Sequence, residues 1–143
     1  MSEQSQAPTT DWVVERGKIA EFARAVQNES AAYTQGDPVA PPTFPQSMAL
    51  WRTRARRPGG PVGREGLDMR RVLHGEQEFE YVRPLRAGDV LTAEANVKDR
   101  YEKEGKRGGT MTFIVTETTF RDANGEVVAY SRGTTIQTSK AAT

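Results

Sequence analysis

Two side chains that can form hydrogen bonds, but are poor proton-transfer groups, stand five residues apart in the segment 26–33. Asn28 carries an amide, which can orient a water molecule but cannot take its proton near neutral pH. Tyr33 can donate a hydrogen bond, yet its reference pKa of about 10 makes it a poor base. Pro42, further along the chain, has no backbone N–H. This set of residues is expected to bind a polar group and hardly to catalyse.

Three titratable residues nearby are weaker candidates for chemistry. Glu29 follows Asn28 in the sequence, and consecutive helical residues point about 100° apart, so we expect Glu29 to face solvent. Asp37 precedes a proline in a loop, where turn formation is its expected role. His74 is the only histidine and is expected to be a structural residue. A non-standard acid or base supplied by Glu29 or Asp37 is the alternative.

A cluster of arginines is the most uneven charge feature of the chain. It consists of Arg52, Arg54, Arg56 and Arg57. One interpretation is a solvated helix end that complements the helix dipole. The other is a patch for phosphate groups or for an acidic partner, because Arg forms paired hydrogen bonds to phosphate.

Composition narrows the class of protein. A chain of 143 residues is expected to form one domain. It contains no cysteine and one histidine, which argues against disulfides and metal sites, and no cofactor is expected. The net charge of +1 gives no nucleic-acid signature, and the apolar runs are too short for a membrane span. The polar N-terminus lacks an apolar signal core, so a cytoplasmic protein is expected.

The sequence pattern predicts helices in the first half of the chain. Residues 1–11 are predicted to be a disordered tail, 12–138 a single domain and 139–143 a frayed end. Apolar residues at steps of three and four predict a helix over about 15–27. After a Gly- and Pro-rich loop, a second helix is expected to begin with Pro45 and to end near Arg57. Its apolar stripe makes it the expected central helix.

From residue 72 onward the pattern changes to the alternation of strands. Strands are predicted over 74–82, 90–97, 110–120 and 126–138, with a hairpin turn at 122–125. They are expected to be consecutive antiparallel neighbours joined by short turns. The predicted fold is therefore α+β, a curved antiparallel sheet wrapped around one helix.

Three segments make this expectation more specific. Residues 39–44, 73–81 and 83–89 read VAPPTF, LHGEQEFEY and RPLRAGD, and in this order they resemble the N-terminal MaoC-type dehydratase family. The resemblance implies a hot-dog fold, dimers with a joint sheet, and substrates carried as thioesters of coenzyme A or acyl carrier protein. In the family an Asp and a His occupy the positions of Asn28 and Tyr33, and a Gly with a free N–H occupies that of Pro42.

The resemblance implies a noncatalytic, acyl-chain-binding subunit of a (3R)-hydroxyacyl-thioester dehydratase or enoyl-CoA hydratase complex. The run Ala25–Asn28 is similar to that of the partner subunit of mycobacterial-type heterodimeric dehydratases. The partner would be a second MaoC-like subunit carrying Asp and His, or a second copy of this chain. Four residues are the expected substrate-binding set: Thr43, Phe44, Met48 and Trp51. The alternatives are a homodimeric hydratase or thioesterase and an acyl-CoA binding or scaffold module.

Overall fold

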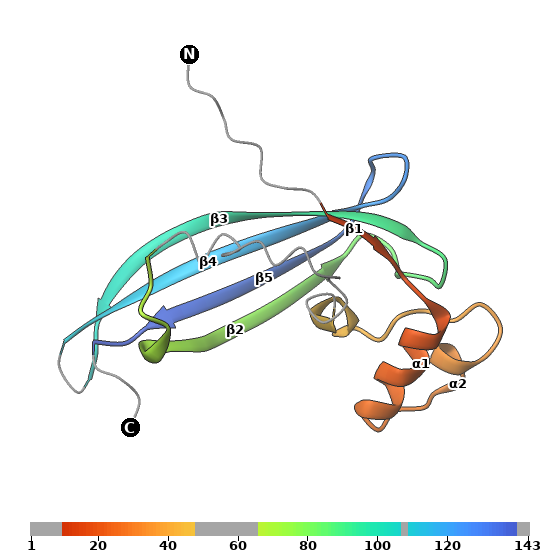
Figure 1. The fold of residues 1–143 in the computed structure, drawn as a ribbon, viewed down its shortest axis with the longest axis horizontal. Helices are drawn as coiled ribbons and strands as arrows, with labels where there is room; N and C mark the ends of the chain where they lie inside the picture. Colours follow the sequence, from red (N-terminus) through yellow and green to blue (C-terminus); the bar gives the residue numbers. More distant parts are fainter. Residues whose placement is uncertain (1–9, 48–65, 107–108, 140–143) are drawn as a thin grey trace, which may run out of the picture.

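A curved five-stranded antiparallel sheet dominates the molecule, with two helices beside one of its ends (Figure 1). The computed structural model describes residues 10–47, 66–106 and 109–139. The strands are β1 (Thr10–Val13), β2 (Val72–Tyr81), β3 (Val90–Glu104), β4 (Thr110–Arg121) and β5 (Val127–Gln137). They are arranged in the order β1-β3-β4-β5-β2, so β1 and β2 form the two margins of the sheet.

The pairing of the strands differs in part from the predicted order. β3, β4 and β5 are consecutive neighbours as expected, but β2 pairs with β5, with Glu78 opposite Arg132, and not with β3. β1 was not predicted, and it begins at Thr10, inside the expected N-terminal tail. β3 also continues to Glu104, beyond the predicted limit of residue 97. The partner of β2 could not be predicted because the alternation of apolar residues reports which face of a strand is buried, and not which strand lies beside it.

The helix α1 (Arg16–Ala25) forms where the apolar periodicity predicts it and buries Ile19 and Ala23. It ends in a Schellman motif, in which Asn28 N–H donates to the Ala23 carbonyl at 2.9 Å. Gln27 adopts the left-handed conformation of this motif, with φ of 57°. The short helix α2 (Ala31–Thr34) follows, and the Ser30 hydroxyl caps its start.

Aromatic stacking fixes the start of the segment that follows the loop. A 3₁₀ turn, η1 (Phe44–Ser47), begins where the second helix was predicted. Phe44 is completely buried, with its ring 5.5 Å from those of both Trp12 and Phe22. The rest of that predicted helix lies outside the described residues. None of the helices formed by the described residues combines the length and apolar character needed to span a membrane.

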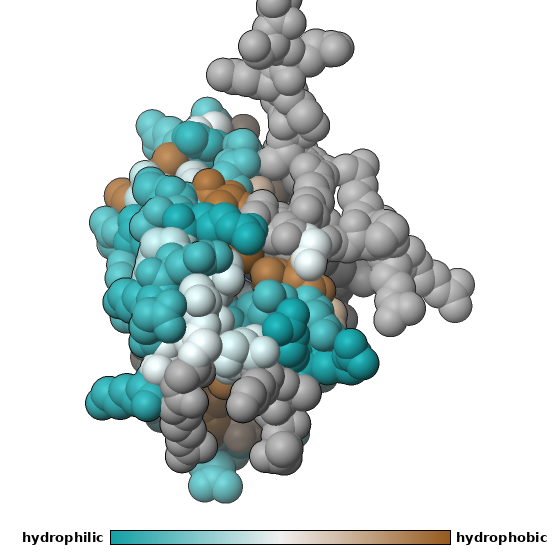
Figure 2. Space-filling view, turned by 90° about the vertical axis from the view of Figure 1, so that its left-hand side faces the viewer, coloured by the Kyte–Doolittle hydropathy of each residue, from teal (hydrophilic) through white to brown (hydrophobic). Residues whose placement is uncertain are grey.

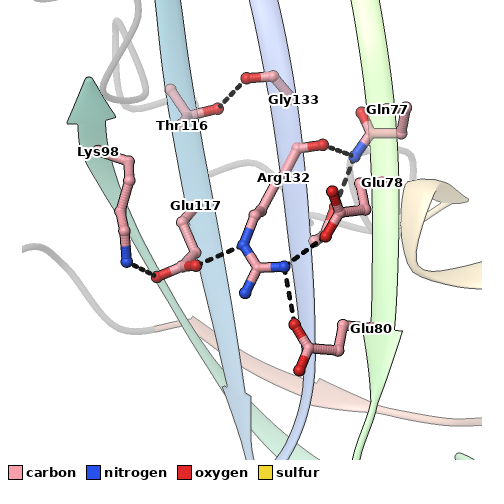
Figure 3. Close-up of polar contacts among 9 residues, drawn as sticks. Gln77, Glu78, Glu80, Lys98, Thr116, Glu117, Arg132 and Gly133 are labelled. Carbon is pink, nitrogen blue, oxygen red and sulfur yellow. Dashed lines mark hydrogen bonds and ion pairs between the residues drawn. The ribbon is translucent and has the colours of Figure 1, made fainter.

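The sheet face opposite the core carries a connected set of charges (Figure 3). Arg132 on β5 contacts Glu117 on β4 at 2.7 Å and Glu80 on β2 at 2.8 Å. It also contacts Glu78, and Lys98 pairs with Glu117 at 3.0 Å. The hydrogen bond from Arg132 is the main cause that holds the pKa of Glu117 below its ordinary value. These contacts join four neighbouring strands, β3, β4, β5 and β2, on the outer face.

The far end of the outer face carries an aromatic pair. Tyr101 and Phe113 stack with their ring centroids 4.9 Å apart, and the Lys103 ammonium lies 5.1 Å from the tyrosine ring. Viewed onto this end of the sheet, the surface is largely hydrophilic with small apolar areas (Figure 2). The concave face holds the core, and the outer face carries the charged contacts of Arg132 and this aromatic pair.

Candidate functional site

An open cavity of about 420 Å³ lies between η1 and the margin strand β2. Five residues line it, two from the turn before and within η1 and three from β2: Thr43, Gln46, His74, Gln77 and Phe79. No carboxylate, lysine or arginine is among these lining residues. Among the residues that the structure describes, no group of three or more His, Asp or Glu side chains is arranged to hold a metal ion.

A β-bulge at Gly75 assembles the β2 side of the cavity. His74 and Gln77 are three residues apart, and in a regular strand they would point to opposite faces. The register shifts between His74 and Glu76, so that His74 lies opposite Thr135 and Gln77 opposite Gly133. The bulge thereby places both side chains on the concave face.

The amide of Gln77 is held in one orientation. Its Nε2 donates to the Ser131 hydroxyl at 2.7 Å and to the Arg132 carbonyl at 3.0 Å (Figure 3). Its Oε1 lies above Gly133, where an added Cβ would be only 3.2 Å away. Glycine at position 133 therefore leaves the space that this carbonyl oxygen occupies.

The peptide between Pro42 and Thr43 is fixed from the opposite wall. The Tyr81 hydroxyl donates to the Pro42 carbonyl at 2.5 Å, and burial raises the pKa of Tyr81 to about 12. In a trans peptide the C=O and the following N–H point in opposite directions. Anchoring the carbonyl on Tyr81 therefore directs the Thr43 N–H away from Tyr81, and this N–H has no hydrogen-bond acceptor among the described residues.

The Tyr81→Phe variant is expected to be about 1 kcal/mol less stable than the wild type near pH 8, because one hydrogen bond is lost. The raised pKa means that the folded phenol keeps its proton to about pH 12, whereas an exposed tyrosine loses it at about 10. Wild-type stability should therefore fall as the pH rises through this window, and the stability difference should shrink. Urea midpoints measured from pH 8 to 11 check this. A stability difference between the wild type and Tyr81→Phe that does not change with pH would contradict this prediction. Tyr101→Phe is the control, because it removes a tyrosine hydroxyl at another place.

The positions predicted to correspond to a catalytic pair do not line this cavity. Asn28 is exposed at the end of α1, where its backbone closes the helix. Tyr33 is half-buried and packs against the core cluster. The Pro42 carbonyl accepts the hydrogen bond from the Tyr81 hydroxyl. Pro42 therefore supplies an acceptor, in addition to lacking a backbone N–H donor.

The two alternative acids lie at the surface. Glu29 is exposed in the turn between α1 and α2. The Asp37 carboxylate pairs with Arg86 at 3.1 Å, in a loop that is joined to the turn after β2 by the bridge between Val39 and Arg86. The turn-forming role expected of Asp37 stays a prediction, and its carboxylate forms an exposed ion pair with Arg86.

Two residues of the predicted substrate-binding set are described: Thr43 lines the cavity, whereas Phe44 lies in the core. The other two, Met48 and Trp51, lie outside the described residues, as does the predicted phosphate or carrier patch of Arg52, Arg54, Arg56 and Arg57. The lining residues Gln46, Gln77 and Phe79 were not predicted, and no signal in the sequence marks the bulge except the glycine at 75.

Comparison with known sequences places the chain in a family. Residues 4–131 match the family model described as the FAS1-like, dehydratase domain region. A UPF0336 protein of Leifsonia xyli subsp. xyli is 34% identical over 145 residues, covering 93% of this chain and 90% of the relative. A UPF0336 protein of Streptomyces griseus is 42% identical over 103 residues, covering 64% of this chain and 65% of the relative's length.

Solved structures show the same architecture. A MaoC-like dehydratase aligns with a TM-score of 0.73 and 26% identity, covering 92% of this chain and 41% of that one. The C-terminally truncated HadBC (3R-hydroxyacyl-ACP dehydratase) complex from Mycobacterium tuberculosis aligns with a TM-score of 0.70 and 21% identity, covering 95% and 99% of the two chains. The chain therefore belongs to the FAS1-like dehydratase-region family and has the hot-dog fold of the MaoC-like dehydratases.

Proposed function

We propose that this chain is a noncatalytic, acyl-chain-binding subunit of a (3R)-hydroxyacyl-thioester dehydratase or enoyl-CoA hydratase complex. Hydration of an enoyl thioester needs a base that activates water and an acid that protonates the adjacent carbon. By the resemblance to the MaoC-type dehydratases, Asn28 and Tyr33 correspond to that family's Asp and His, and neither is suited to proton transfer at neutral pH. The identity of these two residues is the observation that carries the proposal.

The cavity is consistent with an incomplete site. Among the five described lining residues, His74 is the one titratable side chain, and none is a carboxylate that could share the acid and base roles. The reaction itself requires no cofactor, since only water and protons are exchanged. A second chain that carries Asp and His would supply the missing groups.

The partner that we propose is a MaoC-like hot-dog subunit. The similar HadBC structure is itself a complex of a 3R-hydroxyacyl-ACP dehydratase. In this chain β2 ends the sheet, so its outer side is a margin at which another strand can add. The arginines at 52, 54, 56 and 57 would meet the phosphates of coenzyme A or an acidic carrier protein.

The chain alone is expected to hydrate a short enoyl-CoA no faster than a buffer control, because Asn28 and Tyr33 cannot serve as its acid and base. With a MaoC-like partner co-expressed, turnover should rise by at least about 100-fold, the lower limit for general acid–base catalysis. Loss of absorbance of the conjugated thioester measures both rates. Replacing the partner's Asp or His should abolish turnover.

A different result would support the homodimeric alternative. Turnover by the purified chain alone, lost in the Glu29→Gln or Asp37→Asn variant, would contradict the proposal and assign the acid to this chain. Stoichiometric binding of acyl-CoA without turnover in any complex would instead favour a binding module.

Trp51→Ala is expected to shift the chain-length preference of the complex toward longer acyl chains, because it removes the bulkiest side chain of the proposed pocket. The ratio of kcat/KM for long and short enoyl thioesters measures the shift. Trp51→Phe, which keeps an aromatic ring, is the matched control and should change this ratio less. An unchanged ratio in Trp51→Ala would count against the pocket assignment.

A further inference from the structure

Strand β3 has an open edge along most of its length. β1 pairs only with residues 90–93 of β3, whereas β3 continues to Glu104 and is paired with β4 on its other side. Within the described parts of the chain, no strand pairs with the β1 side of residues 94–104, and Figure 1 shows β3 bordering the sheet beyond β1. Such an edge exposes backbone N–H and C=O groups, to which another strand can add.

The end of this open edge is regular. Beyond the bulge in β3, residues 99–104 pair one to one with β4. The Gly105 N–H donates to the Gly109 carbonyl at 2.9 Å, on the β4 side. Because the N–H groups of successive residues in a strand point to opposite sides, those of Arg100 and Glu102 point to the open side.

The charges of this part of β3 are reversed about its central residue. Seven consecutive residues carry the pattern: Lys98, Asp99, Arg100, Tyr101, Glu102, Lys103 and Glu104. Residues at equal distances from Tyr101 have opposite charges. If this strand pairs antiparallel with a copy of itself about a two-fold axis at Tyr101, every charge therefore lies opposite a charge of the other sign.

Other registers of the same pairing bring like charges together. A shift by two residues places Arg100 opposite itself or Glu102 opposite itself, depending on its direction. A shift by one places Arg100 opposite Lys103, or Asp99 opposite Glu102. Like charges directly opposite each other destabilise a sheet. The charge order thus favours one register, whereas charges that only keep an edge strand from aggregating need no such order.

The side chains beside the axis also fit this pairing. Arg100 and Glu102 would form the hydrogen-bonded pairs with the second copy, because their N–H groups point outward. Tyr101 would then form a non-hydrogen-bonded pair with its own copy, in which the Cα atoms are about 4.5 Å apart. Its ring already stacks on Phe113, so the two tyrosines would extend this aromatic stack across the axis.

We infer that two copies of this chain associate through the open edge of β3, with residues 98–104 antiparallel and Tyr101 on a two-fold axis. The Arg100 N–H, which donates to the Asp99 carboxylate at 2.8 Å, donates instead to a carbonyl of the second copy. The Asp99 carboxylate then faces Lys103 of that copy. This contact lies at the opposite margin of the sheet from β2, where the proposed MaoC-like partner adds, so one assembly can contain both contacts.

Sedimentation equilibrium of the full chain over a series of concentrations tests the contact. The wild type is expected to dimerise, and Glu102→Arg should weaken dimerisation about tenfold or more, because it places a positive charge opposite Arg100 at both symmetry-related positions. The double variant Arg100→Glu, Glu102→Arg restores opposite charges and should recover the wild-type affinity. Glu126→Arg is the matched control: it makes the same change of net charge at an exposed position before β5 and should change nothing.

Single cysteines test the register. The chain contains no cysteine, so Tyr101→Cys introduces the only thiol. The axis brings its two copies to a Cα separation of about 4.5 Å, which a disulfide spans, and mild oxidation should give a covalent dimer. Lys103→Cys is the control, because its two copies are offset by four residues, about 14 Å along the strands, and should not be joined.

The outcomes decide the inference separately from the proposed function. A wild type that stays monomeric, or dimerisation that is unchanged in Glu102→Arg, overturns it. So does oxidation that joins Tyr101→Cys no better than Lys103→Cys. Thermal unfolding shows whether each variant folds, and the cysteine variants keep the test valid if Glu102→Arg does not fold. Turnover with the MaoC-like partner is measured independently of this contact.

Discussion

Replacing Phe44 by alanine is expected to lower the free energy of unfolding by about 3–5 kcal/mol, the cost of emptying a large aromatic site in a core. The Phe44 ring is fully buried and lies against both Trp12 of β1 and Phe22 of α1. Its loss removes the contact that holds η1, and with it Thr43, against the sheet. Urea unfolding followed by tryptophan fluorescence measures the change.

Phe79→Ala is the matched comparison for Phe44→Ala. Phe79 is also on the concave face but is only half-buried beside the cavity, so its replacement should cost clearly less. A loss below about 1 kcal/mol for Phe44→Ala would contradict the view that this ring joins β1, α1 and η1.

Gly75→Val is expected to destabilise the protein by about 1–3 kcal/mol through overpacking. A Cβ at this position would be 2.6 Å from the Ile136 Cδ1 and 3.2 Å from the Thr134 carbonyl oxygen. The Ile136 side chain can move, but the Thr134 carbonyl oxygen is part of the backbone of β5 and can move only with that strand. β2 should therefore separate locally from β5, which would also move His74 and Gln77. Chemical denaturation gives the stability.

Gly17→Ala provides the control for a general effect of replacing glycine. A Cβ at Gly17 meets nothing within 4 Å, and the residue lies in α1. This change should be neutral or stabilising by up to about 1 kcal/mol, because alanine favours the helix. A similar loss of stability in Gly17→Ala and Gly75→Val would mean that the contact of the new side chain with Ile136 and Thr134 does not cause the loss in Gly75→Val.

Local periodicity was sufficient to predict several elements. Ile19 and Ala23 recur at helical spacing, and α1 buries both. The alternation in β4 and β5 gave their bounds to within one residue. β1 was missed because its four residues are too few for alternation to stand out beside a polar tail. The pairing of β2 with β5 joins residues that are 48 positions apart at Tyr81 and Ala129 and 65 apart at Val72 and Gln137, which no local pattern reports.

The geometry of the candidate site could not be predicted from the sequence. The roles of Asn28 and Tyr33 stay predictions from residue type, and neither residue lines the cavity. The meeting of His74 with Gln77 depends on one extra residue in β2, which changes the face of every residue on one side of it. The bond between Tyr81 and Pro42 spans 39 positions in the sequence, so the directed Thr43 N–H could be found only in the folded chain.

The position of β2 at the margin of the sheet ties ligand binding to assembly. The strand that carries His74, Gln77 and Phe79 is also the strand to which a second chain can add. If an added strand raises the affinity of the cavity for a ligand by some factor, the ligand must raise the affinity of the two chains for each other by the same factor. The ligand would then hold the two chains together, and its depletion would favour their dissociation.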